Sequence, residues 1–253
     1  MVVTVLPGCE PLSHVAGARV GALVVHGFTG SPASMRGVAD ALVAAAFDVE
    51  LPRLPGHGTT VEDMLTTTWH DWAGEVDAAW RTLAERVERL VVVGQSMGAT
   101  LALSLALARP DTSGLVCINP ATRLRDADTM AMIDELIEDG PPVVPGEGSD
   151  IADPDGTDIA YPGTPLAPLR SLLIEGIAPI THRFGELKMP LRLFTSRQDH
   201  VVEPADSEYL AARYGGPVDH VWLERSYHVA TQDFDRSIVI DGTVSFVRGI
   251  AES

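Results

Sequence analysis

Short runs of apolar residues alternate with longer helical patterns along most of this chain. The runs that predict buried strands in the first half are Ala22–His26, Phe47–Leu51, Leu90–Gly94 and Gly114–Asn119. Between them lie three helical patterns, at about 32–46, 69–87 and 97–108, and Ser31-Pro32 supplies an N-cap and an N1 proline for the first. Strands separated by helices form βαβ units, whose parallel sheet is covered by helices on both faces. We therefore predict an α/β fold with a mostly parallel central sheet flanked by helices.

The alternation stops at about Thr122 and resumes at Leu191–Thr195. Asp126–Glu138 predicts one amphipathic helix, the stretch 139–168 is rich in Pro, Gly and Asp, and a second helix is expected at about 169–184. A helix near 204–213, a strand near 218–223 and a last helix near 236–250 complete the pattern. Because a long irregular stretch in a compact domain usually has a function, we interpret residues 122–185 as a cap. It is inserted over an active site, between the two parts of one α/β core, residues 1–121 and 186–253.

The acidic composition argues against two classes of partner. The chain has 35 Asp and Glu against 18 Lys and Arg, which gives a net charge of −17. It has no basic stripe to neutralise nucleic-acid phosphates and no basic patch for an anionic membrane surface. With 45% hydrophobic residues in 253 positions, it does have enough apolar material for one large core.

Cysteine usage and the N-terminus bear on the compartment. Cys9 and Cys117 are too few for a disulfide scaffold, so a reduced setting is the simpler expectation, although one bridge is possible. Met1–Gly8 lacks the basic and apolar regions of a signal peptide, and no run of about 18 apolar residues predicts a membrane helix. We expect a cytoplasmic protein without stable membrane insertion. No residue cluster has metal-ligand spacing and no dinucleotide fingerprint occurs, so neither metal nor cofactor is expected.

The pentapeptide Gly94-Gln95-Ser96-Met97-Gly98 fits the pattern Gly-x-Ser-x-Gly and lies between a predicted strand and a predicted helix. In such a turn the serine adopts a strained backbone conformation and its hydroxyl projects from the sheet edge. The residues two before and two after it approach closely and must be small, as Gly94 and Gly98 are. Ser96 is therefore our candidate nucleophile. The alternative interpretation is a serine that caps the helix.

A serine hydroxyl needs a base, and in this arrangement the chain order is serine, acid, histidine. Four histidines follow Ser96: His182, His200, His220 and His228. His182 lies in the predicted cap. His200 directly follows Asp199, the candidate acid discussed below, and His220 lies inside a predicted strand. His228 lies in a loop between the last predicted strand and the last helix, so we predict it to be the base.

The best acid candidate is Asp199. It follows the predicted strand Leu191–Thr195, at the carboxyl end where sites form in open α/β sheets. Glu203 and Asp206 are near but fall at the start of the next helix, where acids favour the helix dipole.

The tetrahedral intermediate of acyl transfer needs two backbone N–H donors. One is expected on Met97, directly after the nucleophile. The other is expected in the loop after an early strand, at His26-Gly27-Phe28, where we choose Phe28. We interpret the His26 side chain as a core imidazole.

Five segments carry a resemblance to a known family. They are His26-Gly27-Phe28-Thr29-Gly30-Ser31-Pro32, Pro55-Gly56-His57-Gly58, Gly94-Gln95-Ser96-Met97-Gly98, Asp199-His200-Val201-Val202 and Ser226-Tyr227-His228-Val229-Ala230-Thr231. In this order they resemble the bacterial monoacylglycerol lipases and small carboxylesterases of the α/β-hydrolase superfamily. The resemblance implies a cofactor-independent serine hydrolase with a small cap and carboxylic-ester substrates. It also implies the triad Ser96, Asp199 and His228 with Phe28 and Met97 as oxyanion donors.

The predicted cap both resembles that family and departs from it. Gly148-Ser149-Asp150-Ile151 and Ala160-Tyr161 are similar, but the relatives tend to carry an acid after the Ala-Tyr pair that is associated with the glycerol head, and Pro162 stands here. The resemblance therefore favours ester hydrolysis more than it favours glycerol esters. The expected residues of the acyl pocket are Met130, Ile133 and Ile151, since adaptable apolar side chains suit acyl chains; for the first two, plain packing against the core is an equal alternative.

The sequence thus predicts a serine hydrolase that cleaves carboxylic esters, monoacylglycerol-like or short-to-medium acyl, through an acyl-enzyme. Alternatives on the same fold are a hydrolase of C–C bonds, a peptidase or an acyltransferase. A non-catalytic binding protein is the alternative of a different class. The expected partner is a small ester substrate and not a nucleic acid.

Overall fold

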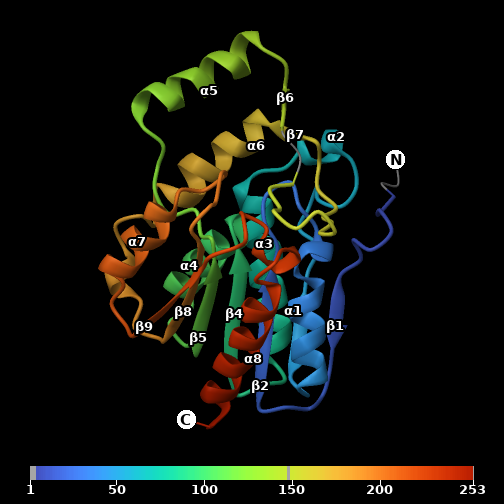
Figure 1. Cartoon of the computed structure of the whole chain (residues 1–253), viewed down its shortest axis with the longest axis vertical. Coiled ribbons are helices and arrows are strands. Elements are labelled where there is room, and N and C mark those ends of the chain that lie inside the picture. Colours follow the sequence, from blue (N-terminus) through green and yellow to red (C-terminus); the bar gives the residue numbers. More distant parts are fainter. Residues whose placement is uncertain (1–3, 147–148, 253) are drawn as a thin grey trace.

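The computed structural model describes residues 4–146 and 149–252, and within them the main sheet has seven strands (Figure 1). Their spatial order is β1-β3-β2-β4-β5-β8-β9, and all neighbouring pairs are parallel except β1 and β3. The strands are β1 Leu12–His14, β2 Val20–Val25, β3 Asp48–Leu51, β4 Arg89–Gln95, β5 Gly114–Ile118, β8 Leu191–Ser196 and β9 Val218–Leu223. The predicted α/β fold with a mostly parallel sheet is confirmed.

Helices connect these strands, and several of them cover the two faces of the sheet. They are α1 Pro32–Ala44, α2 Val61–Met64, α3 Trp69–Ala84, α4 Met97–Ala108, α5 Ala127–Asp139, α6 Leu166–Ser171, α7 Pro204–Arg213 and α8 Arg236–Glu252. Within the described part of the chain, none of them is long and apolar enough to cross a membrane.

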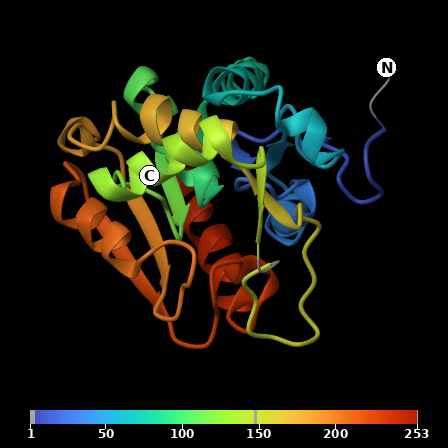
Figure 2. The same ribbon diagram turned by 90° about the horizontal axis from the view of Figure 1, so that it is seen from above.

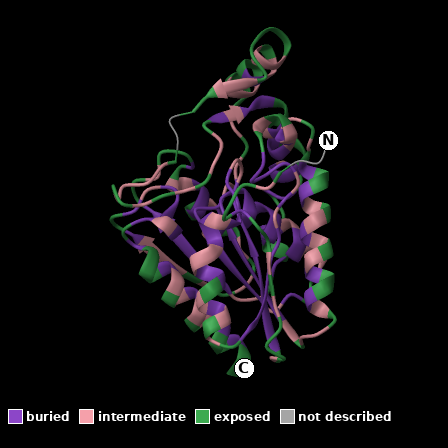
Figure 3. Ribbon diagram, turned by 90° about the vertical axis from the view of Figure 1, so that its right-hand side faces the viewer, coloured by how far each residue is buried: buried purple, intermediate pink, exposed green. Residues whose placement is uncertain are grey.

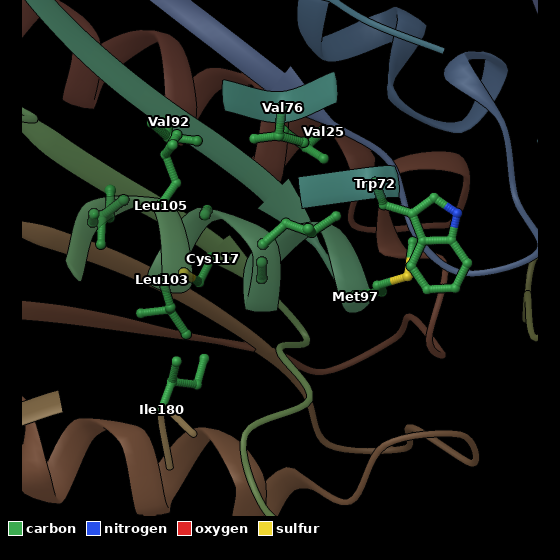
Figure 4. Close-up of a cluster of buried hydrophobic side chains, with 14 of the residues drawn as sticks. Val25, Trp72, Val76, Val92, Met97, Leu103, Leu105, Cys117 and Ile180 are labelled. Carbon is green, nitrogen blue, oxygen red and sulfur yellow. The ribbon is translucent and has the colours of Figure 1, made fainter. Parts of the chain in front are cut away.

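Side chains alternate between the two faces along each central strand, and this divides the core into two layers. On β2, Leu23 and Val25 pack into the layer under α3 and α4, whereas Ala22 and Val24 pack into the layer under α1 and α8. Figure 3 shows the buried strands at the centre and helices that bury only one side. Figure 4 shows the α4-side layer, where Met97 lies beside Trp72. Because the central strands are packed on both faces, the positions of their ends are fixed.

Several features of the fold differ from the sequence-based expectation. The edge strand β1, with the sequence Leu-Ser-His, is polar enough to carry no strand pattern, and its antiparallel pairing with β3 holds it in place. The helix expected at 169–184 is shorter: α6 is followed by the π-helical segment Leu172–Ile177 and then by turns. A second, two-stranded sheet of β6 (Val143–Pro145) and β7 (Gly163–Pro165) lies in the Pro- and Gly-rich stretch that we expected to be irregular.

The described part of residues 122–185 lies between β5 and β8, which are neighbours in the sheet. Its helix α5 and strands β6 and β7 stand above the ends of the main strands (Figure 1), and the view from above shows α5 and α6 crossing over the sheet (Figure 2). This arrangement supports our proposal that the inserted stretch acts as a cap.

Candidate active site

Ser96 lies in a sharp turn between β4 and α4. Its backbone angles are φ 55° and ψ −121°, which residues other than glycine rarely adopt. The Ser96 side chain makes no capping hydrogen bond to α4, which contradicts the alternative interpretation of a helix cap. The strained turn instead presents the hydroxyl to a cavity.

Close backbone approach explains both glycines of the pentapeptide. A Cβ atom on Gly94 would lie 2.2 Å from the carbonyl oxygen of Gly98. One on Gly98 would lie 2.3 Å from the carbonyl oxygen of Val25. These atoms belong to packed backbone, so any side chain here would displace the turn that holds Ser96.

Two loops at the carboxyl ends of β8 and β9 bring His228 and Asp199 together. The His228 Nδ1 atom is 2.7 Å from Asp199 Oδ2, and the two side chains are only 9% and 2% exposed. The other oxygen of Asp199 accepts the backbone N–H groups of Val201 and Val202, at 2.9 and 2.8 Å. The carboxylate is thus fixed from both sides, and the imidazole donates from Nδ1 and leaves Nε2 free to accept a proton.

Asn119, which the sequence analysis did not single out, ties these two loops to each other. Its side-chain amide donates to the carbonyl oxygen of His228 at 2.8 Å and to the hydroxyl of Ser196 at 3.0 Å. Its side-chain oxygen accepts the backbone N–H of Ser196 at 2.8 Å. Asn119 has φ 45°, a conformation that asparagine tolerates better than most residues. The sequence feature that could have identified Asn119 is its position as an asparagine at the carboxyl end of a predicted buried strand.

The two expected oxyanion donors lie on the segments that flank Ser96. Phe28 follows Gly27, where a Cβ atom would be 3.3 Å from the Cβ of Ser96, so this loop passes directly against the nucleophile. Within residues 4–146 and 149–252, the backbone N–H groups of Phe28 and Met97 have no hydrogen-bond acceptor. They are available to a bound oxyanion.

Ser96 and His228 line the same cavity, which has a volume of about 480 Å³. The segment 149–164 contributes much of its remaining wall, including Asp150, Asp158 and Tyr161.

Met130, Ile133 and Ile151, expected to form an acyl pocket, are not among the residues that line this cavity. Met130 and Ile133 pack into the core layer on the α4 side instead, because the apolar side of α5 faces that layer. Gly148 of the resembling cap segment lies outside the described residues.

Asp158 is a cavity-lining carboxylate that the sequence analysis did not identify. Its Oδ1 atom is buried without a hydrogen-bond partner in the described structure. Its Oδ2 atom makes a long contact of 3.4 Å with the hydroxyl of Ser149. Burial raises the pKa of this carboxyl above its ordinary value. An acceptor in this state is suited to a polar group of a ligand, since a buried polar atom without a partner is costly.

His26 and His57 are fully buried, their ring centroids lie 5.0 Å apart, and neither lines the cavity. The His26 ring donates to the carbonyl of Gly27 and accepts the N–H of Leu54 at 3.2 Å, as expected for a core imidazole. The His57 Nδ1 atom is 2.9 Å from the carbonyl oxygen of Pro55. Burial lowers the pKa of His57 from 6.5 to about 4, and burial with the neighbouring His57 also lowers the pKa of His26.

These pKa values predict that acid destabilises the fold. Because the pKa of His57 is lowered in the native state, the unfolded chain binds more protons than the native state between pH 6.5 and pH 4. The free energy of unfolding is therefore highest above pH 6.5 and decreases as the pH falls toward 4. For His57 alone the loss of unfolding free energy is about 3 kcal/mol. Urea unfolding at pH 7 and pH 4.5 measures it. His57→Asn, which keeps a short donor for Pro55, should show a shallower decline; an identical decline in both proteins would contradict the assignment.

A mostly parallel sheet with a strained serine between β4 and α4 defines an α/β hydrolase, and comparisons with known proteins agree. The family described as serine aminopeptidase, S33, matches residues 18–139. A thermostable monoacylglycerol lipase of Bacillus sp. (strain H-257) is 39% identical over 96% of this chain and 95% of its own length. A carboxylesterase of Bacillus subtilis (strain 168) is 23% identical over 94% and 96%.

A solved structure reported among metagenome-derived lipolytic enzymes superposes with a TM-score of 0.90 at 40% identity, covering 97% of this chain and 100% of the other. The chain belongs to the family of bacterial monoacylglycerol lipases and small carboxylesterases within the α/β-hydrolase superfamily. It is a lipase/esterase-type hydrolase.

Proposed function

We propose that this chain hydrolyses carboxylic esters through an acyl-enzyme, with Ser96 as nucleophile, His228 as general base and Asp199 as the acid that orients it. The observation that carries the proposal is the buried 2.7 Å contact between His228 and Asp199, beside a cavity onto which the strained Ser96 also opens. A nucleophile, a base and an orienting acid are the parts that acyl transfer by serine requires.

In the first half of the reaction, the Ser96 oxygen attacks the ester carbonyl and its proton passes to Nε2 of His228. The negative charge on the carbonyl oxygen is stabilised by the N–H groups of Phe28 and Met97, and each such donor typically contributes about 2.7–4 kcal/mol. The Asp199 carboxylate stabilises the imidazolium. Collapse of the intermediate breaks the ester bond, and His228 returns the proton to the leaving alcohol.

In the second half, water takes the place of the alcohol. His228 accepts a proton from the water molecule while the water oxygen attacks the acyl carbon. The second intermediate collapses, the acid product leaves, and Ser96 recovers its proton. The first half-reaction passes the proton of Ser96 to the alcohol and the second returns one to Ser96 from water, so the full cycle restores Ser96 and His228 without an external acid or base.

We further propose that the alcohol part of the substrate carries a free hydroxyl group, as in a monoacylglycerol. The unpaired oxygen of Asp158 in the cavity supports this, because it can accept a hydrogen bond from such a hydroxyl. Pro162, whose place suggested a poor fit to glycerol esters, does not line the cavity. The relative at 39% identity is itself named a monoacylglycerol lipase.

A substrate panel tests the proposed function. It contains 1-monolauroylglycerol, methyl laurate, p-nitrophenyl butyrate and amino-acid p-nitroanilides, each measured before and after treatment with a fluorophosphonate. We expect hydrolysis of the esters that is lost on treatment, and little hydrolysis of the anilides. Efficient cleavage of the anilides would favour a peptidase instead, in line with the name of the matching family.

Replacement of Asp158 by leucine is expected to lower kcat/KM for 1-monolauroylglycerol by about 10- to 100-fold, because a hydrogen bond to a charged group is worth about 1.5–3 kcal/mol. Methyl laurate has no free hydroxyl, so its kcat/KM should change less than about threefold. Steady-state kinetics with both esters measures the difference. Asp155→Leu, at an exposed position of the same segment, is the matched control. Equal losses with both esters would contradict the assignment.

A further inference from the structure

Aspartates accept the backbone N–H groups of five consecutive residues in the loop that carries His228. The backbone N–H groups of Arg225 and Ser226 donate to the Asp235 carboxylate, and that of Tyr227 donates to Asp233. The N–H of His228 donates to the Asp150 carboxylate at 3.0 Å, and that of Val229 to the backbone carbonyl of Asp150 at 3.0 Å. Every residue from 225 to 229 thus donates its N–H to an aspartate, which fixes the main chain of the base.

Asp150 differs from the other two aspartates in its origin and its contacts. Asp233 and Asp235 follow the loop in sequence, whereas Asp150 belongs to the inserted stretch 122–185. Its Oδ2 atom accepts the N–H of His200 at 3.1 Å in addition to that of His228. Its Oδ1 atom lies 2.8 Å from Nδ1 of His200. Because His200 directly follows Asp199, one carboxylate bridges the loop of the acid and the loop of the base.

The segment around Asp150 is itself attached at a second point. The backbone N–H groups of Ala152 and Asp153 donate to the Asp233 carboxylate at 2.8 and 2.9 Å. The Asp150 side chain is only 15% exposed, so water competes little with its contacts. The carboxylate is therefore held in place while it holds the two loops.

We propose that Asp150 is a positioning residue of the active site, whose carboxylate sets the distance between Asp199 and His228. The proposal rests on the proposed function, because it assigns a task within that triad. Asp150 does not touch the reacting atoms. Without it, the His228 N–H and the loop after Asp199 lose a shared acceptor, and the two loops are held against each other by fewer contacts, among them those of Asn119 and the one between His228 and Asp199.

Replacement of Asp150 by alanine is expected to lower kcat for p-nitrophenyl butyrate by about 10- to 100-fold, because small misplacements of a catalytic group cost up to about 100-fold. KM should change less than about threefold. The rate of phosphonylation of Ser96 by a fluorophosphonate should fall in parallel with kcat. The downfield proton NMR signal of the hydrogen bond between His228 and Asp199 should shift or broaden. A residue that merely stabilised the fold would leave that signal in place.

Asp153→Ala is the matched control. Asp153 lies three residues further along the same segment, and its side chain contacts Arg236 and the N–H of Asp155 rather than either catalytic loop. We expect its kcat and its downfield signal to equal those of the unmodified protein. If Asp150→Ala has the same kcat and downfield signal as Asp153→Ala, the proposal is wrong, whatever happens to the melting temperature.

Asp150→Asn keeps one oxygen that can accept both N–H groups but places an amide nitrogen opposite Nδ1 of His200, so its kcat should lie about three- to tenfold below that of the unmodified protein and above that of the alanine variant. If the alanine variant does not fold, a kcat for Asp150→Asn at least threefold below that of Asp153→Asn supports the proposal, and equal values overturn it. Failure of the proposed function is a separate result, since it would appear as an unmodified protein whose Ser96 is not phosphonylated.

Discussion

Replacing Ser96 by alanine is expected to lower kcat for ester hydrolysis by about 10⁴- to 10⁶-fold, because removal of a serine nucleophile leaves only binding and oxyanion stabilisation. The fold should remain intact. The Ser96 side chain makes no capping hydrogen bond, and alanine at φ 55° has the same backbone strain as serine. The melting temperature should therefore change by only a few degrees while activity disappears.

The measurement is kcat for p-nitrophenyl butyrate together with covalent labelling by a fluorophosphonate. Ser34→Ala is the matched control, because Ser34 lines the same cavity but donates its hydroxyl to the carbonyl of Ser31. Ser34→Ala should keep its activity and its label. A Ser96→Ala variant that hydrolyses esters at a near-normal rate, or a label found on another residue, would show that the nucleophile lies elsewhere.

The central part of the fold was predictable because its signals are local. Helix α4 and the strand before it follow from an apolar run that ends at Gly94, and α7 begins at Pro204 as its sequence indicates. The edge strand β1 and the pair β6 and β7 were missed because their pairing partners, rather than their own residues, determine their conformation.

The candidate site divides in the same way. The contact between Asp199 and His228 follows from chain order and from the positions of loops after strands, both of which the sequence displays. The contacts of Asp150 and Asp158 depend on how the inserted segment lies against the core, and no local periodicity encodes that placement. The segment's resemblance to relatives drew attention to Pro162, whereas the carboxylates of this segment that line the cavity belong to Asp150 and Asp158.

Asparagine in place of Asp199 is expected to lower kcat by about 10⁴-fold, since the loss of this acid leaves the histidine in the wrong tautomer. The geometry shows why the loss should be chemical rather than structural. The side-chain oxygen of asparagine can still accept the N–H groups of Val201 and Val202, which now bond to Oδ1. Its amide nitrogen then faces Nδ1 of His228 in place of Oδ2.

An amide donor opposite Nδ1 forces that atom to accept, so the ring proton moves to Nε2 and the imidazole can no longer take the proton of Ser96. KM and the melting temperature should change little, whereas kcat falls. Glu203 lies four residues after Asp199 and forms an exposed ion pair with Arg123, so Glu203→Gln is the matched control and should keep its activity. If Asp199→Asn retains more than about a tenth of the normal kcat, orientation of His228 by Asp199 is not the source of its basicity, and the acid must be sought elsewhere.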